Sequence, residues 1–489
     1  MNSVQHFFEY SGTLSKDFIL GREEKISYPE IISQVQHVAR FLRANYGGQS
    51  NILLLGNNSV FFILAYLSIL RSGNVCIPLN PNVSDKTLEY IIATCNPTLA
   101  FIQSAALDRL DAFDVDIISE QNINILPEVN HATSLPSTDS SQVAEIIFTS
   151  GSTALPKGVM LTHKNLIANT ESIIEYLHLS QNDIMEVVLP FFYCYGLSLL
   201  HTHLRVGGSL VLNNKFIFVN TVIDDLQTYN CTGFAGVPSH FQILLRNSEL
   251  FKKTQFPALK YVTQAGGKLA DPFIREFVQF FPEVQFFVMY GQTEATARLS
   301  YLPSEKVLEK IGSIGRGIPG VELEVLDAKG RKILPGENGN IVATGDNIMA
   351  GYLNDPELTD QTIINGKLYT GDIATLDEDG YIFIVGREKE FIKVGGERVS
   401  PKEIEQVIVS IPDIVDCSVI GVEDDLLGEA IKVIVVPKNF NNTEKLRQQI
   451  LSACLDQLGQ IKAPKHVEFI DKIPMNSSGK KTKAALQQL

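Results

Sequence analysis

The chain has 489 residues, of which 45% are hydrophobic and 20% are charged, the composition of an ordinary globular protein. This length exceeds what a single hydrophobic core usually serves, so a large unit and at least one further domain are expected. The formal net charge of −14 argues against nucleic-acid binding, because a nucleic-acid surface needs clustered positive charge to contact phosphates.

Nothing in the sequence predicts a membrane span or export. The longest apolar run, at 60–70, is about half of the roughly 20 residues that cross a bilayer, and it predicts a buried helix. The first twelve residues lack the basic start and long apolar core of a secretory signal, so a cytoplasmic location is expected. The six cysteines show no C-x-x-C spacing, which favours reduced thiols over a cysteine-held metal.

The pattern of apolar runs predicts an α/β fold with parallel-rich sheets. Buried strands are expected where short apolar runs occur, at 51–56, 73–80, 98–103, 144–150, 208–213 and 284–291. Helix-length segments separate them, for example at 28–45, 58–71 and 163–179, and this alternation is typical of α/β architecture. The fold class is thus a large multi-subdomain α/β unit followed by a smaller domain.

The pattern of predicted strands and helices changes twice in the second half of the chain. From about Gly312, short strands and frequent glycines predict a small β-rich subdomain over about 312–388. After Arg387 the remaining hundred residues have a β-α-β-like pattern. We therefore predict an N-terminal domain over 1–388 and a small, mobile α+β C-terminal domain over 389–489.

A segment rich in hydroxyl groups and glycine follows one predicted strand, TSGSTALPKG at 149–158. Its small residues let backbone N–H groups approach an anion, its hydroxyls donate hydrogen bonds, and Lys157 adds a positive charge. The spacing is not that of a Walker A loop. Taken alone, the segment would be interpreted as a flexible Ser/Gly loop.

Four further blocks follow in order: YGQTE at 290–294, YTGD at 369–372, GREKEFIKVGGERVSPKEIE at 386–405 and IPMNSSGK at 473–480. Each alone has an ordinary explanation, respectively a surface glutamate, a turn, a helix start and a solvated lysine. Lys481 and Lys483, which follow the last block, are expected to be solvated. Together with the 149–158 segment, the blocks resemble the adenylate-forming (AMP-binding) superfamily of acyl-CoA synthetases, firefly-type luciferases and peptide-synthetase adenylation domains. Ala154 departs from this pattern, since the family usually has glycine there.

The resemblance implies a role for each matching residue. Tyr290 is implied to stack on adenine, Asp372 and Arg387 to bond the ribose, and Thr293 to bond the phosphate, while Glu294 holds Mg²⁺. Lys480 is the implied catalytic lysine, with Thr293 and Glu294 as the other catalytic residues. The full set implied to bind ATP or AMP is Thr149, Ser150, Gly151, Ser152, Thr153, Lys157, Gly266, Gly267, Tyr290, Gly291, Asp372 and Arg387.

The implied reaction has two halves. A carboxylate attacks the α-phosphate of Mg·ATP and releases pyrophosphate, and a thiol then attacks the acyl-adenylate and releases AMP. Lys389 occupies the family's hinge position, so rotation of the small domain would withdraw Lys480 and bring Gly395 and Gly396 forward to line a thiol tunnel. The implied ligands are ATP, Mg²⁺ and CoA, or phosphopantetheine on a carrier protein.

The substrate is expected to be a small-molecule carboxylic acid, of the fatty or aryl class. Tyr193, Cys194, Tyr195, Gly196 and Phe241 are the candidate acyl-pocket residues, which suit an apolar or aromatic acid. Tyr193 stands where many acyl-CoA synthetases have histidine, and the F-D-x-S block that would bind an amino acid's ammonium group is absent.

Three alternatives to a CoA ligase stay open. A stand-alone adenylation enzyme that loads an acyl carrier protein would share every motif. A luciferase-like oxidase is disfavoured because the chain ends Leu-Gln-Gln-Leu rather than Ser-Lys-Leu. A silent nucleotide-binding protein is the least favoured, because the charged residues of all five blocks are present.

Overall fold

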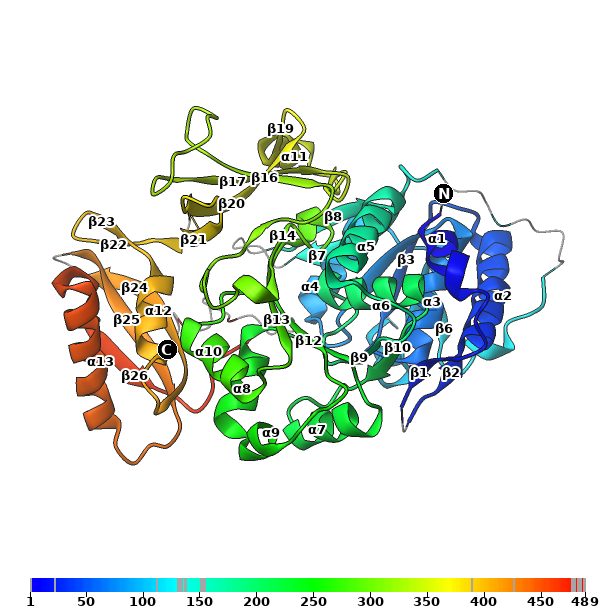
Figure 1. Cartoon of the computed structure of the whole chain (residues 1–489). Helices are drawn as coiled ribbons and strands as arrows, with labels where there is room; N and C mark the ends of the chain where they lie inside the picture. The colour runs from blue at the N-terminus through cyan, green and yellow to red at the C-terminus, as the bar shows by residue number, and fades with distance from the viewer. Residues whose placement is uncertain are drawn as a thin grey trace.

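The protein is seen here as a computed structural model that describes residues 2–21, 23–110, 113–129, 135, 139–149, 155–387, 390–424, 427–475, 481 and 486. Within these residues the chain builds sheets of nine, seven, five and five strands. Figure 1 shows a large body at the N-terminal end, a smaller sheet above it and a separate C-terminal domain at its side. The predicted α/β fold with a separate C-terminal domain is confirmed.

The seven-stranded sheet contains the first predicted strands, and its central strands are parallel. It is parallel there because helices connect successive strands and cover the faces. Its order is β18 (Gly351–Tyr352), β8 (Lys157–Thr162), β7 (Val143–Thr149), β4 (Val75–Leu79), β3 (Asn51–Leu55), β5 (Leu99–Ile102) and β6 (Asp116–Ser119).

The nine-stranded sheet carries the remaining predicted strands of the large domain. Its order is β15 (Arg316–Gly317), β14 (Ser300–Leu302), β13 (Gln285–Tyr290), β12 (Tyr261–Gln264), β11 (Gly233–Gly236), β9 (Ile184–Val187), β10 (Ser209–Leu212), β1 (Asp17–Leu20) and β2 (Ile26–Ser27). From β13 to β1 the pairs are parallel, so the carboxyl ends of β11, β12 and β13 lie along one edge.

Helices fill the space between these two sheets and cover their outer faces. The helix predicted from the longest apolar run, α3 (Val60–Ser72), is buried on nearly all sides and packs with α6 (Cys194–Val206) in a core shared by both sheets. The other helices of the large domain are α1 (Ser3–Ser11), α2 (Tyr28–Tyr46), α4 (Asp85–Cys95), α5 (His163–Leu177), α7 (Val219–Thr228), α8 (Pro238–Asn247), α9 (Glu249–Lys253), α10 (Asp271–Phe280) and α11 (Pro356–Thr362). No helix among the described residues is both long and apolar enough to cross a bilayer.

The β-rich segment forms its own five-stranded sheet, from β16 (Val321–Leu326), β17 (Asn338–Gly345), β19 (Ile363–Ile364), β20 (Lys367–Leu376) and β21 (Ile382–Arg387). It does not keep every strand of the predicted range, because β15 joins the nine-stranded sheet and β18 pairs with β8. These two strands tie the subdomain to the large body.

The C-terminal domain has the expected α+β character. Its sheet contains β22 (Ile392–Val394), β23 (Glu397–Val399), β24 (Ile414–Asp424), β25 (Gly428–Pro437) and β26 (His466–Phe469), and its helices are α12 (Pro401–Val409) and α13 (Thr443–Leu458). Residues 388 and 389 lie outside the described residues, so the domain boundary placed there stays a prediction.

Candidate active site

The loop after β13 brings the YGQTE block to the carboxyl edge of the nine-stranded sheet, where open α/β sheets usually bind ligands. Gly291 allows this loop to fold back on itself, because a Cβ atom at this position would lie 1.9 Å from the backbone oxygen of Ala297. The Leu299 backbone N–H then donates to the Tyr290 oxygen, at 2.9 Å. The block is therefore held rigidly where the strand ends.

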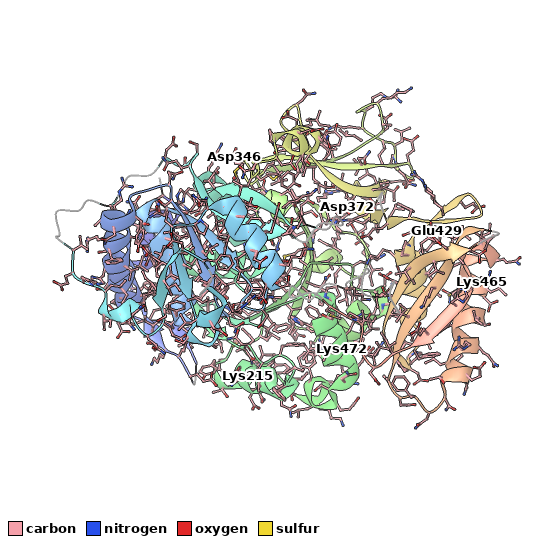
Figure 2. The ribbon with its side chains drawn as sticks, turned by 180° about the vertical axis from the view of Figure 1, so that it is seen from behind. Lys215, Asp346, Asp372, Glu429, Lys465 and Lys472 are labelled. Carbon is pink, nitrogen blue, oxygen red and sulfur yellow. The ribbon has the colours of Figure 1, made fainter. Side chains whose placement is uncertain are left out.

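Three predicted nucleotide residues meet at Asp372. The Tyr290 hydroxyl donates to Asp372 Oδ2 at 2.6 Å, and Arg387 Nε donates to Asp372 Oδ1 at 2.9 Å. Burial and the adjacent Asp372 charge raise the pKa of Tyr290 well above its ordinary value, so its hydroxyl stays a donor. Figure 2 places Asp372 between the β16–β21 sheet and the large body. Each carboxylate oxygen has a further lone pair that can accept from a hydroxyl group.

A second cluster connects Glu294 with Lys157, the first residue of β8. The Tyr352 hydroxyl donates to Glu294 Oε1 at 2.8 Å, and Lys157 Nζ lies 5.7 Å from the centroid of the Tyr352 ring. Lys157 is opposite Thr149 in the β7–β8 pair, and it lines a cavity of about 270 Å³ together with Tyr352 and Phe148. The structure therefore brings one carboxylate and one cation of the predicted phosphate site to the same tyrosine.

Tyr352 has no predicted role, because it lies in none of the five blocks described above. The signal was the Gly-Tyr pair of β18, which joins the β-rich segment to β8 and so reaches Glu294. Burial and the Glu294 charge raise the pKa of Tyr352, which keeps this hydroxyl protonated as a donor.

Four candidate acyl-pocket residues lie together at the start of α6. Cys194 Sγ is 3.6 Å from Thr293 Oγ1, which links this helix to the YGQTE block. The Tyr195 hydroxyl donates to the Thr263 backbone oxygen at 3.0 Å. Gly196 is needed for the close approach, since a Cβ there would lie 2.1 Å from the Pro190 oxygen. Tyr193 is the N-cap residue of α6.

The remaining candidates of the large domain lie elsewhere along the sheet edge or in the core. Gly266, with φ +85°, and Gly267 follow β12, the parallel neighbour of β13. Phe241 is fully buried in α8, where its ring centroid is 5.3 Å from Phe286 in a separate aromatic cluster. The structure thus does not bring Phe241 together with Tyr195 and Cys194.

Several predicted residues lie outside the described residues: Ser150, Gly151, Ser152, Thr153, Lys389 and Lys480. Gly395 and Gly396 are described, at the tip of the β22–β23 hairpin, with φ +58° and +90°. The hairpin extends away from β13 in Figure 1.

The prediction that Lys481 is solvated is wrong. Lys481 Nζ forms an ion pair of 2.7 Å with Asp416 of β24, and only 25% of the lysine side chain is exposed. Burial lowers the pKa of Lys481, but the neighbouring acids, Asp416 first, outweigh this and raise it, so the lysine stays charged. No motif signals this pairing, because Asp416 and Lys481 are far apart in sequence.

The small domain is docked on the large one through a few polar contacts. Gln406 of α12 donates to Asp271 Oδ2 at 2.6 Å and accepts from Lys268 Nζ at 2.9 Å. Gln242 of α8 donates to Asp416 Oδ1 at 3.3 Å. Buried residues of both domains also belong to one hydrophobic cluster.

Comparison with known proteins gives matches along nearly the whole chain. Residues 10–353 match the AMP-binding enzyme family, and residues 403–480 match the AMP-binding enzyme C-terminal domain. The chain belongs to the AMP-binding enzyme family.

Relatives within this family are named as CoA ligases. The probable CoA ligase CCL9 of Humulus lupulus is 30% identical, with 94% of this chain and 91% of that protein covered. The 4-coumarate–CoA ligase-like 6 of Arabidopsis thaliana is 29% identical, with coverages of 95% and 86%. The chain is therefore an AMP-forming acid–thiol ligase, as the sequence predicted.

Two solved structures of one protein match this chain to different degrees. ATP-bound MatB from Rhodopseudomonas palustris is 27% identical, with coverages of 100% and 98% and a TM-score of 0.90. The apo structure of the same protein is matched over the same shares, at 28% identity, with a TM-score of 0.79. Over the whole chain, this AMP-binding enzyme is thus more similar to the ATP-bound structure of MatB than to its apo structure.

Proposed function

We propose that this enzyme uses ATP and Mg²⁺ to convert a small carboxylic acid into its CoA thioester through a bound acyl-adenylate. In the first half-reaction a carboxylate oxygen bonds to the α-phosphorus, the bond between the α- and β-phosphates breaks, and pyrophosphate leaves. In the second, the thiolate sulfur bonds to the acyl carbon, the bond to the AMP oxygen breaks, and AMP leaves. The first step turns a poor acyl donor into a good one.

The observation that carries this proposal is the meeting of sequence-distant residues at the end of β13. Asp372 with its two donors suits the paired hydroxyl groups of a ribose, as described above. Glu294 and Lys157, both next to Tyr352, suit Mg²⁺ and phosphate oxygens. Mg²⁺ bound there would neutralise charge on the pyrophosphate leaving group.

The residues of this chain contribute by holding charged groups in position for the reaction. Tyr352 orients the Glu294 carboxylate, Arg387 and Tyr290 orient Asp372, and Lys480 would supply a cation between the substrate carboxylate and the α-phosphate. The similarity to ATP-bound MatB supports the view that the small domain is arranged for the first half-reaction.

CoA is the proposed acceptor because the two relatives reported above are named CoA ligases. A carrier-protein acceptor is the competing hypothesis. It would use the same first half-reaction and differ only in the thiol that enters from the side of the small domain.

The test is acid-dependent release of pyrophosphate by the full chain with ATP, Mg²⁺ and a panel of fatty, aryl and dicarboxylic acids. With CoA added, mass spectrometry should detect the acyl-CoA product in amounts equal to AMP. Lys480→Ala should lower adenylation by about 100-fold or more, since preorganised charge is worth several kcal/mol in a transition state. The matched control is Lys472→Ala, an exposed lysine labelled in Figure 2, which should keep full activity.

The other outcomes separate the alternatives. Adenylation without CoA consumption, followed by acylation of a phosphopantetheine-bearing carrier protein, would replace CoA as the acceptor. Binding of ATP without pyrophosphate release for any acid would contradict the proposed reaction and favour a silent nucleotide-binding protein.

A further inference from the structure

Arg298 is the only buried arginine or lysine among the described residues, with 3% of its surface exposed. It lies between the YGQTE block and β14, four residues after Glu294. Its backbone oxygen accepts from Asn347 Nδ2 at 2.7 Å and from Asn169 Nδ2 at 3.2 Å. The residue is therefore fixed in place by its main chain.

The surroundings of the Arg298 guanidinium contain no carboxylate partner within the described part of the chain. Nε donates to Met289 Sδ at 3.1 Å, and the guanidinium carbon lies 4.1 Å from the centroid of the Tyr195 ring. Burial raises the pKa of Tyr176, while the nearby charge of Arg298 and a hydrogen bond with it oppose that rise. A thioether, a ring face and a hydroxyl are weak partners for a group with five N–H donors.

Buried charges in proteins are normally paired with an opposite charge or hydrogen-bonded throughout. Glu276 shows the ordinary case in this chain, where it forms a part-buried ion pair with Arg246. Arg298 lacks such an acid although it is more deeply buried. A ligand that brings its own anion would complete its coordination.

Arg298 also lies next to the candidate acyl pocket. Its guanidinium stacks on Tyr195, whose neighbour Cys194 contacts Thr293 at 3.6 Å. Its backbone follows Ala297, which lies against Gly291. An acid with its reacting carboxylate beside Thr293 would extend past Cys194 towards Tyr195 and the guanidinium.

We propose that Arg298 is a specificity-determining residue that binds the second carboxylate of a dicarboxylic acid substrate. This inference rests on the proposed function, because it names the residue that binds the non-reacting end of the acid that the enzyme activates. Arginine suits the task because its planar fork binds a carboxylate through two parallel hydrogen bonds. The stacked Tyr195 ring, whose hydroxyl is held by Thr263, fixes the plane of that fork.

The experiment compares matched acids with the full chain, ATP and Mg²⁺: succinate against butanoate, and 4-carboxycinnamate against cinnamate and 4-hydroxycinnamate. The readouts are kcat and KM for pyrophosphate release, with acid binding measured separately by calorimetry. In each set, the diacid should have the higher kcat/KM, by about tenfold or more.

The variants test the residue itself. Arg298→Met should lower kcat/KM for diacids by about 100-fold, mainly by raising KM, and for monoacids by less than about threefold. Arg298→Lys should restore part of the loss, and Arg275→Met, at an exposed position of α10, should change neither class.

Several results would overturn the inference while leaving the proposed function intact. Equal activity on diacids and monoacids, with equal losses in Arg298→Met, would make Arg298 a structural cation. A preference for 4-hydroxycinnamate over 4-carboxycinnamate and cinnamate would mean that Arg298 binds a phenolic hydroxyl group instead of a carboxylate. Absence of pyrophosphate release with every acid would contradict the proposed function; calorimetric binding of diacids that Arg298→Met abolishes would still support the site.

Discussion

Glu145, in the middle of β7, is a buried acid that takes no part in the proposed reaction. The Tyr66 hydroxyl donates to Glu145 Oε2 at 2.7 Å and also contacts His201 Nε2 at 2.8 Å. Burial raises the pKa of Glu145 from 4.5 to about 7, although the Tyr66 hydrogen bond opposes it. Burial also lowers the pKa of His201 to about 3, so the neutral forms of both groups are favoured in the folded chain.

The raised pKa predicts a pH-dependent stability term. A carboxyl group that is harder to ionise in the folded state contributes fully below about pH 4.5, and the contribution is lost as pH rises through about 7. The free energy of unfolding therefore falls by about 3 kcal/mol in total as pH rises across this range. Glu145→Gln should therefore gain stability relative to the wild type as pH rises from about 5 to about 7.5, measured as the difference in urea unfolding free energy at each pH.

The difference between the two proteins is the quantity to measure, because His201 acts with the opposite sign. Its lowered pKa gives a contribution that is present above about pH 6.5 and is lost as pH falls. The exposed Glu378→Gln is the matched control and should follow the wild type at every pH. Parallel curves for Glu145→Gln and the wild type would show that Glu145 is ionised in the folded chain.

Strand β24 holds the end of the chain through Asp416. Lys481 donates to Asp416 Oδ1 and to the Cys417 backbone oxygen, and the Cys417 N–H also donates to Asp416 Oδ1, at 2.9 Å. Removal of Asp416 would leave the part-buried Lys481 and the Cys417 N–H without this acceptor, at a cost of about 1 to 3 kcal/mol. Asp416→Ala should accordingly destabilise the C-terminal domain by about this amount, measured by urea unfolding.

The same pair predicts an effect on the reaction. Lys481 directly follows the predicted catalytic lysine in the sequence, so loss of its ion pair with Asp416 is expected to affect the half-reaction that this lysine serves. Lys481→Met should slow pyrophosphate release more than it slows transfer from a supplied acyl-adenylate to CoA. The double variant Asp416→Leu/Lys481→Met should recover part of the stability that Asp416→Ala loses. Equal slowing of both half-reactions would instead indicate general unfolding of the small domain.

Local patterns predicted the elements well and the contacts between elements poorly. The six predicted strands and three predicted helices of the large domain are all present, because each is an apolar segment of the right length between glycine or polar turns. The motifs singled out Asp372, Glu294 and Arg387 from local sequence alone, although two of their hydrogen-bond partners lie 58 and 82 residues away, and the roles of these residues stay predictions. The positions of Arg298, Tyr352 and Lys481 depend on burial or on partners 49 to 129 residues away, and only the Gly-Tyr pair of β18 gives a sequence signal for any of them.

At the scale of the whole molecule, the two domains meet through polar contacts as well as through a shared hydrophobic cluster. Gln406 makes two of the polar contacts, one with Asp271 and one with Lys268. Interfaces between domains that move are typically more polar than permanent ones. Two hydrogen bonds, one of them to a carboxylate, are worth about 2 kcal/mol, which is enough to shift the ratio of two arrangements by more than tenfold.

Gln406→Ala should therefore shift the enzyme away from the docked arrangement, in which Gln406 bonds Asp271 and Lys268. Pyrophosphate release should fall by about tenfold, because the small domain is docked less often, whereas transfer from a supplied acyl-adenylate to CoA should be unchanged or faster. The exposed Gln449→Ala, on α13, is the matched control and should leave both half-reactions unaffected. The rates of the two half-reactions are measured separately by rapid quench. An equal loss of rate in both half-reactions would mean that Gln406 stabilises the fold of the small domain and not its docked position.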